Sequence, residues 1–119
     1  MLLLFGTNGG AIAYEAIFER DQTVQQVVEY VKSSTSEDAV VICQPQYGAL
    51  VTPRHWISSL EWEIGNNYYL IYTPIHFFAP IYVEGVQNGF VIKNDTIFRF
   101  NKIETINDVQ IYLISAEFS

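Results

Sequence analysis

One amphipathic helix stands out in a chain whose other apolar positions follow strand patterns. Its valines recur at helical spacing and form a single stripe, Val24, Val27, Val28 and Val31. Thr23 is a suitable N-cap, and Gln26 three residues later would complete a capping box. A short helix rich in β-branched residues is marginal alone, so we expect residues 23–32 to be held against a sheet.

Strand-like patterns lie on both sides of this helix. Leu2–Phe5 and Ala11–Glu19, separated by Gly9-Gly10, predict a β-hairpin. After the helix, apolar runs predict strands at Ala39–Cys43, Ala49–Val51 and Tyr68–Thr73. Between the last two, Thr52-Pro53 with the apolar residues up to Leu60 suits a short helical turn.

The last part of the chain has strand patterns throughout. Residues 75–119 show no helical periodicity, and Pro80 restricts its neighbours to a sheet edge or to two short strands. The predicted strands are a hairpin from Gly89–Lys93 through Asn94-Asp95 to Thr96–Phe100 and a last strand at Gln110–Ser115.

The order of these elements over residues 1–73 resembles the ubiquitin-like β-grasp family. The matching features are Met1 in a strand, Gly9-Gly10 in the first turn, Thr23-Val24 opening the helix, Val41-Ile42, Tyr47-Gly48-Ala49-Leu50, the Trp56 to Leu60 turn and Tyr69-Leu70-Ile71-Tyr72. The resemblance implies a mixed sheet that grips the helix and a sheet face that contacts proteins. Conjugated and sulfur-carrier members end in Gly-Gly, whereas this chain ends Ala116-Glu117-Phe118-Ser119, so neither chemistry is expected.

The predicted fold class is therefore α+β. A β-grasp-like domain would occupy residues 1–74, with its helix at about 23–33. An all-β extension would follow over residues 75–119 and pack on that domain or on a second chain.

Composition narrows the class of function. Half of the residues are hydrophobic and 15% are aromatic, which indicates a packed core. The net charge of −7 and the scattered basic residues argue against a nucleic-acid partner. The sequence has neither an apolar run of transmembrane length nor the apolar core of a signal peptide, and Cys43 is its one cysteine. We expect a cytoplasmic protein without a membrane partner.

Candidate catalytic groups are few. Cys43 and His55 are the one conceivable nucleophile–base pair, but Cys43 ends a strand predicted to be buried, where cysteine packs as a small hydrophobe. His55 and His76 lack the spacing of metal ligands. Glu61 and Glu63 would do acid–base work only if burial separated their pKa values, and beside a polar turn we expect both in solvent.

The glycine-rich stretch from Gly6 to Gly10 offers no stronger candidate. A strand follows it, whereas a phosphate-binding loop leads into a helix and carries a nearby lysine. A hairpin turn is therefore favoured over an anion site. No cofactor and no metal are predicted.

A surplus of aromatic residues in the second half of the chain is the most informative feature. They are Tyr68, Tyr69, Tyr72, Phe77, Phe78, Tyr82, Phe90, Phe98, Phe100, Tyr112 and Phe118. One interpretation is a second packed layer; the other is an interface, where Tyr and Phe are enriched. The interface hypothesis assigns an interaction surface to Tyr69, Tyr72, Phe77, Phe78, Tyr82, Phe98 and Phe100.

The predicted function is a non-enzymatic protein–protein interaction module, acting as an adaptor, an inhibitor or a subunit of a complex. We expect it to bind a protein partner and to form a homodimer. One alternative is a small hydrolase- or nuclease-type enzyme, which would need a pocket that gathers His55 or His76 with Glu61, Glu63 or a tyrosine. Another is a viral or assembly structural protein.

Overall fold

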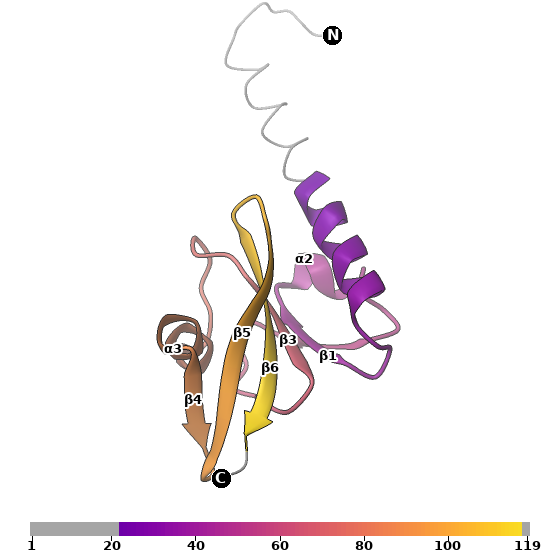
Figure 1. The fold of residues 1–119 in the computed structure, drawn as a ribbon. Helices are drawn as coiled ribbons and strands as arrows, with labels where there is room; N and C mark the ends of the chain where they lie inside the picture. Colours follow the sequence, from indigo (N-terminus) through magenta and orange to yellow (C-terminus); the bar gives the residue numbers. More distant parts are fainter. Residues whose placement is uncertain (1–21, 118–119) are drawn as a thin grey trace, which may run out of the picture.

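The computed structural model describes residues 22–117 and shows an α+β fold (Figure 1). A helix over residues 22–34 precedes β1 (Val40–Cys43), α2 (Pro45–Gly48), β2 (His55–Ser58), β3 (Tyr68–Tyr72), α3 (Pro80–Asn88), β4 (Phe90–Lys93), β5 (Thr96–Ile106) and β6 (Val109–Glu117). The hairpin predicted at Leu2–Glu19 lies outside the described residues. In residues 22–117, no helix is long and apolar enough to cross a membrane.

The strands form one mixed sheet of six, in the order β2-β1-β3-β6-β5-β4. β1 is parallel to both β2 and β3, and the remaining neighbours are antiparallel. β6 pairs with β3 from Tyr68↔Ile114 to Tyr72↔Gln110. Strands from both halves of the chain therefore belong to one continuous sheet.

Each face of the sheet is covered by its own hydrophobic core. The helix of residues 22–34 covers a core that is mostly aliphatic: Val27, Val28, Val31, Val41, Cys43, Tyr47, Val51, Ile71, Val109 and Ile111. The other core contains α3 and most of the buried aromatic side chains: Ile42, Ile57, Ile64, Leu70, Phe78, Ala79, Tyr82, Val91, Phe98, Phe100, Tyr112 and Ile114. Successive strand residues point to opposite faces, which is why β1, with a core on each side, is apolar at every position.

The predicted helix is confirmed, but its ends differ. Gln22 is already helical, so Thr23 is not the N-cap and the predicted capping box is wrong. The helix also continues past Lys32 through Ser34. Its last carbonyls are bound by Arg54, whose Nη2 donates to the backbone oxygens of Lys32 at 2.8 Å and Thr35 at 2.7 Å. A side chain from a distant loop thus satisfies carbonyl groups at the C-terminal end of the helix.

The expectations for residues 49–60 are wrong. The predicted strand at Ala49–Val51 is a turn after α2, and the predicted helical turn of Trp56 to Leu60 is replaced by strand β2. β2 pairs along its whole length with β1, from Val40↔His55 to Cys43↔Ser58. Because this pairing is non-local, it overrides the local helical spacing.

The expectation of strands throughout residues 75–119 is also wrong, because α3 lies there. Pro80 occupies the first turn of the helix, where its missing N–H is harmless. Gly89 ends the helix at a φ of 86°, and its N–H donates to the Gly85 oxygen at 2.8 Å. Tyr82 and Gly85 face inward. A buried glycine on this face weakens the apolar stripe by which the helix could be found.

The C-terminal hairpin and last strand are confirmed as β4, β5 and β6. Asn94 and Asp95 have φ values of 53° and 64°, the left-handed pair of a type I′ turn. Phe98 and Phe100 face the core, whereas Arg99 between them is exposed, as the alternation of the strand requires.

Candidate functional site

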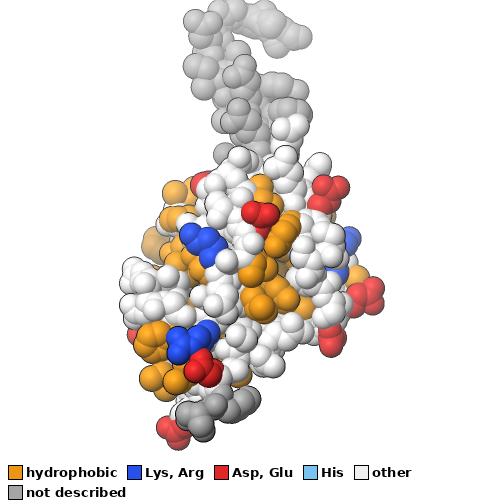
Figure 2. All heavy atoms as spheres, viewed as in Figure 1, with side chains coloured by type: hydrophobic (Ala, Val, Ile, Leu, Met, Phe, Trp, Pro, Cys, Tyr) orange, Lys and Arg blue, Asp and Glu red, His pale blue; other side chains and the backbone are white. Residues whose placement is uncertain are grey.

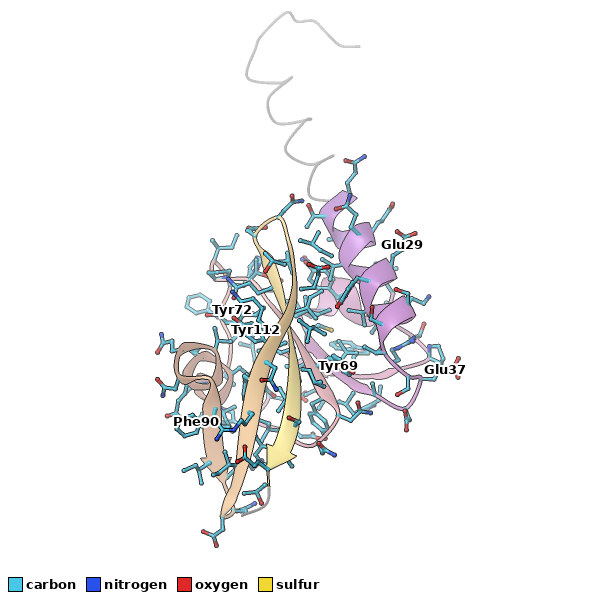
Figure 3. The ribbon with its side chains drawn as sticks, viewed as in Figure 1. Glu29, Glu37, Tyr69, Tyr72, Phe90 and Tyr112 are labelled. Carbon is cyan, nitrogen blue, oxygen red and sulfur yellow. The ribbon has the colours of Figure 1, made fainter. Side chains whose placement is uncertain are left out.

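The aromatic surface predicted from the sequence is mostly interior. Phe78, Tyr82, Phe98 and Phe100 are buried in the core beside α3, so assigning them to an interaction surface is wrong. Tyr69 and Tyr72 are half-buried, and Phe77 is 88% exposed. The centroid of the Tyr72 ring lies 4.7 Å from that of Phe78 and 6.4 Å from that of Tyr112. Figure 3 shows Tyr72 and Tyr112 side by side. Much of the aromatic surplus forms a second packed layer.

Cys43 and His55 do not form a nucleophile–base pair. His55 pairs with Val40, at the opposite end of β1 from Cys43. The Cys43 thiol is fully buried, and this burial raises its pKa to about 12, so it stays protonated at neutral pH. Among residues 22–117, no group of three or more His, Cys, Asp or Glu side chains is placed to hold a metal ion.

Glu61 and Glu63 are both exposed, as expected beside a polar turn, and Glu63 also holds a loop in place. The Tyr82 hydroxyl donates to the Glu63 carbonyl at 2.7 Å and accepts from the Glu63 N–H at 3.2 Å. The Tyr68 hydroxyl donates to the Glu63 carboxylate at 2.7 Å. Beside Glu63, Ile64 is buried in the core. Two tyrosines therefore anchor the segment that follows β2.

This anchored loop presents Trp62 to solvent. The Trp62 side chain is 64% exposed although its neighbour Glu63 is held by several hydrogen bonds. At the start of the loop, the Ser59 N–H donates to the Cys43 carbonyl at 3.0 Å, and the Ser59 carbonyl accepts from the Ala79 N–H at 2.8 Å. Binding through Trp62 would therefore require little ordering of the backbone.

Strand β4 lies close to Trp62 and forms one edge of the sheet. The two-residue turn Asn94-Asp95 joins β4 to β5 and sets the hydrogen-bonding pattern between them. In this pattern the N–H and C=O groups of Val91 and Lys93 point toward β5, and those of Phe90 and Ile92 point away from β5. No described strand lies on that outer side. Ile92 is 64% exposed and Phe90 is 38% exposed.

A groove of about 290 Å³ runs along this edge. It is lined by Trp62, Pro80, Ile81, Glu84, Val91, Ile92 and Lys93. Figure 2 shows hydrophobic atoms gathered over the β4 end of the sheet, beside basic and acidic side chains, and Figure 3 shows Phe90 there. We call Trp62, Ile81, Phe90, Ile92 and the groove's charged residues Glu84 and Lys93 the β4 edge surface.

Sequence reasoning missed Trp62 and Ile92, the central residues of this surface. The available signal for Trp62 was a large aromatic side chain between Glu61 and Glu63, a polar setting that cannot bury it. For Ile92 the signal was its alternation with Val91 in a strand that precedes a tight turn.

A second and larger hollow, of about 860 Å³, lies at the far end of β5, beside the turn between β5 and β6. His76 and Tyr47 both line it, whereas Glu61 and Glu63 do not. Burial raises the pKa of Tyr47, so its hydroxyl stays protonated. The pocket thus gathers His76 with a tyrosine, which is the geometric requirement stated for the enzyme alternative, although neither glutamate lines it.

Comparison of the chain with protein-family models, with curated proteins and with solved structures gave no match. The class of protein is therefore defined here only by its fold, an α+β domain with a six-stranded mixed sheet. A function for it has to follow from the geometry of the described residues.

The tyrosines that anchor the Trp62 loop predict instability at alkaline pH. Burial and the bond to Glu63 raise the pKa of Tyr68 to about 12, and burial raises the pKa of Tyr82. Between pH of about 10 and 12 the unfolded chain loses the Tyr68 proton while the native protein keeps it, and the raised pKa of Tyr82 acts in the same direction, so the free energy of unfolding should fall as pH rises. Urea unfolding across this range should show the decline.

The Tyr68→Phe variant should lose less stability over the same pH range, because it has one fewer phenol to ionise. Tyr69→Phe, on the opposite face of β3, is the matched control. An equal decline in Tyr68→Phe and in the unmodified protein would contradict the assignment of this pH dependence to Tyr68.

Proposed function

We propose that this protein is a non-enzymatic protein-interaction module that acts through the β4 edge surface, and that its partner is a second copy of the chain. The observation that carries the proposal is the outer side of β4. Its backbone groups at Phe90 and Ile92 meet no described strand, and exposed Trp62 and Ile92 flank it. An open strand edge beside apolar side chains favours the addition of another strand.

A two-fold axis through Val91 gives a register that fits this edge. Phe90 would then pair with Ile92 of the partner subunit, and Ile92 with Phe90 of the partner subunit, using the backbone groups that point outward. Directly opposed aromatic and β-branched side chains stabilise antiparallel pairs. The groove carries both Glu84 and Lys93, so its charges are complementary to a second copy of itself.

The contrast with the adjoining part of β5 supports this choice of β4. The stretch Asn101–Thr105 of β5 extends beyond its pairing with β4, which ends at Arg99. That stretch carries Lys102 and Glu104, and the register with β6 shifts between them. Charges and bulges are the usual protection of an exposed strand. By contrast, β4 carries the apolar side chains of Phe90 and Ile92 at the positions whose backbone groups point away from β5.

The Ile92→Pro variant tests the strand pairing directly. Proline removes the outward N–H of residue 92 but none of the N–H groups that face β5, so the β4–β5 hairpin should persist. We expect the dissociation constant of the dimer, measured by sedimentation velocity, to rise about tenfold or more. Because each chain carries a net charge of −7, self-association of the unmodified protein should strengthen as salt screens the repulsion.

Ile92→Thr keeps the N–H and the branched Cβ and is the matched control. Phe77→Ser removes an exposed aromatic residue that does not line the groove. Trp62→Ala should weaken the dimer and Phe77→Ser should not. A monomer at high micromolar concentration, or a dimer indifferent to Ile92→Pro, would refute the proposal. In the first case, binding to a different protein through Trp62 would be the remaining form of the interaction hypothesis.

The finer description of the fold belongs to the same proposal. A ubiquitin-like β-grasp over residues 1–74, extended by residues 75–119, is supported by a helix packed on one face of a mixed sheet. A cytoplasmic location is part of the same proposal and accords with the single cysteine, Cys43, which is free. The β-grasp predicts that residues 2–19 form a hairpin, which cross-strand amide contacts in an NMR spectrum would reveal.

A further inference from the structure

Part of one face of the sheet has no covering layer among the described residues. The helix of residues 22–34 packs over β1, β3 and the first part of β6, where Ile71, Val109 and Ile111 belong to its core. In Figure 1 this helix lies toward β1, and no described helix crosses in front of the lower ends of β5 and β6. The same face of the sheet continues there without a second layer of described residues above it.

Apolar side chains lie on this part of the face. Because successive residues alternate, Leu113 points to the same face as Ile111, and its register partner Tyr69 on β3 points with it. Ile97 on β5 lies on this face as well, because its neighbour Phe98 points into the opposite core. Tyr69, Ile97 and Leu113 are half-buried, and none of them packs against either core of the described residues. We call these three residues the uncovered face.

Polar side chains border the uncovered face. Arg99 and Glu117 form an ion pair on the same side of the sheet, and both side chains are about half exposed. Asn101, which pairs with Leu113, is also exposed. Figure 2 shows hydrophobic atoms open to view over the middle of β5 and β6, between charged side chains. An apolar patch with a polar border is typical of a surface that another segment or protein covers.

The chain enters the described structure beside this face. Asn107, in the turn between β5 and β6, donates from Nδ2 to the Thr23 hydroxyl at 2.7 Å, so the first described turn of the helix is held at the tip of these two strands. Leu113 lies about 13 Å further along β6 than Val109, the first residue of that strand. Residues 1–21 would span up to about 70 Å if extended, so their length allows them to fold back over the uncovered face.

These preceding residues carry a complementary apolar pattern. In the strand predicted at Ala11–Glu19, the side chains of Ile12, Tyr14, Ala16 and Phe18 fall on one face. We call these four the N-terminal apolar set. A hairpin of two strands is marginal in water by itself and needs another layer to pack on. A sheet face without a layer and an apolar strand without a partner therefore occur at neighbouring points of one chain.

We propose that residues 11–19 dock on the uncovered face of their own chain through the N-terminal apolar set. The segment would form a second layer beside the helix of residues 22–34. None of the three residues of the uncovered face belongs to the β4 edge surface. This docking goes beyond the proposed self-association, and the two can fail or succeed independently.

The test is a nuclear Overhauser measurement on the full chain with ¹³C-labelled methyl groups. The methyl groups of Leu113 and Ile97 should show contacts to side chains of the N-terminal apolar set. In a mixture of labelled and unlabelled chains, these contacts should not arise between different chains. They should persist in Ile92→Pro, in which pairing through β4 is removed, so a failure of self-association leaves this test intact.

Stability provides a second readout. Leu113→Gln should raise the equilibrium constant for unfolding about tenfold or more, because docking would bury an amide without a partner. Phe77→Gln, at a site that is 88% exposed, is the matched control and should change it little. In an Ile12→Gln background, the effect of Leu113→Gln should be smaller, because the layer above position 113 is already weakened.

Each of four results would overturn the proposal. The first is the absence of contacts between the N-terminal apolar set and the uncovered face, and the second is contacts that arise only between different chains. The third is an effect of Leu113→Gln no larger than that of Phe77→Gln. The fourth is an equal effect of Leu113→Gln with and without Ile12→Gln, which would mean that these two positions do not meet.

Discussion

Replacing Arg54 with methionine should lower the free energy of unfolding by about 3 kcal/mol, since hydrogen bonds from charged groups contribute about 1.5 to 3 kcal/mol each. Arg54 is 6% exposed, and its guanidinium serves the C-terminal end of the helix of residues 22–34. Nη2 donates to the carbonyls of Lys32 and Thr35, and Nε donates to the Thr35 hydroxyl at 2.7 Å. The positive charge also lies at the negative end of the helix dipole.

The comparison of two further variants separates charge from geometry at this position. Arg54→Lys keeps the charge but loses the planar fork that reaches several acceptors, so it should fall between the unmodified protein and Arg54→Met. Arg99→Met is the matched control, because Arg99 is exposed and its ion pair with Glu117 is at the surface. Urea unfolding that gave the same change for Arg54→Met and Arg99→Met would contradict this account.

Replacing Gly85 with alanine should destabilise the protein by about 2 kcal/mol, although alanine is the better helix former. The intrinsic gain is about 1 kcal/mol in the interior of a helix such as α3. Against it, a Cβ at position 85 would overlap the ring of Phe100, which is buried on β5. Overpacking of a filled core costs about 1 to 3 kcal/mol, and here the overlap is close enough to exceed the gain in propensity.

A double-mutant cycle with Phe100→Leu tests the cause. A smaller side chain at position 100 removes the overlap, so Gly85→Ala should be less destabilising, or stabilising, in the Phe100→Leu background. Gly89→Ala is the control for the backbone alone, since that site has open space around it but a φ of 86°. Equal effects of Gly85→Ala in both backgrounds would show that the Phe100 ring is not responsible.

These two residues also show where local sequence reasoning could not reach. Arg54 follows Pro53 in what reads as the start of a helical turn, and its role depends on helix carbonyls about twenty residues earlier in the chain. Gly85 interrupts the apolar stripe of α3, and the reason for it lies on β5. In both cases the partner is distant in sequence, and no periodicity within a window of a dozen residues contains it.

The candidate sites follow the same division. Trp62 is conspicuous in the sequence, but the hydrogen bonds that anchor its loop come from Tyr68 and Tyr82, on β3 and α3. Thr73 reads only as the end of a strand. It lines the hollow at the far end of β5 because the fold brings the β5–β6 turn and the helix of residues 22–34 near it.

Elements whose signals are local could be predicted without knowledge of the fold. The valine stripe marked the helix, a β-branched run marked β1, a run of aromatic and aliphatic residues marked β3, and Asn94-Asp95 marked the turn of the C-terminal hairpin. Spacing and turn chemistry act between near neighbours, so these patterns are legible without a fold. Tertiary structure alone decided that β2 is a strand, that α3 is a helix, and that most of the aromatic residues proposed for a surface are buried. Those outcomes depend on strand pairing and on a second core, both of which are contacts between residues far apart in the chain.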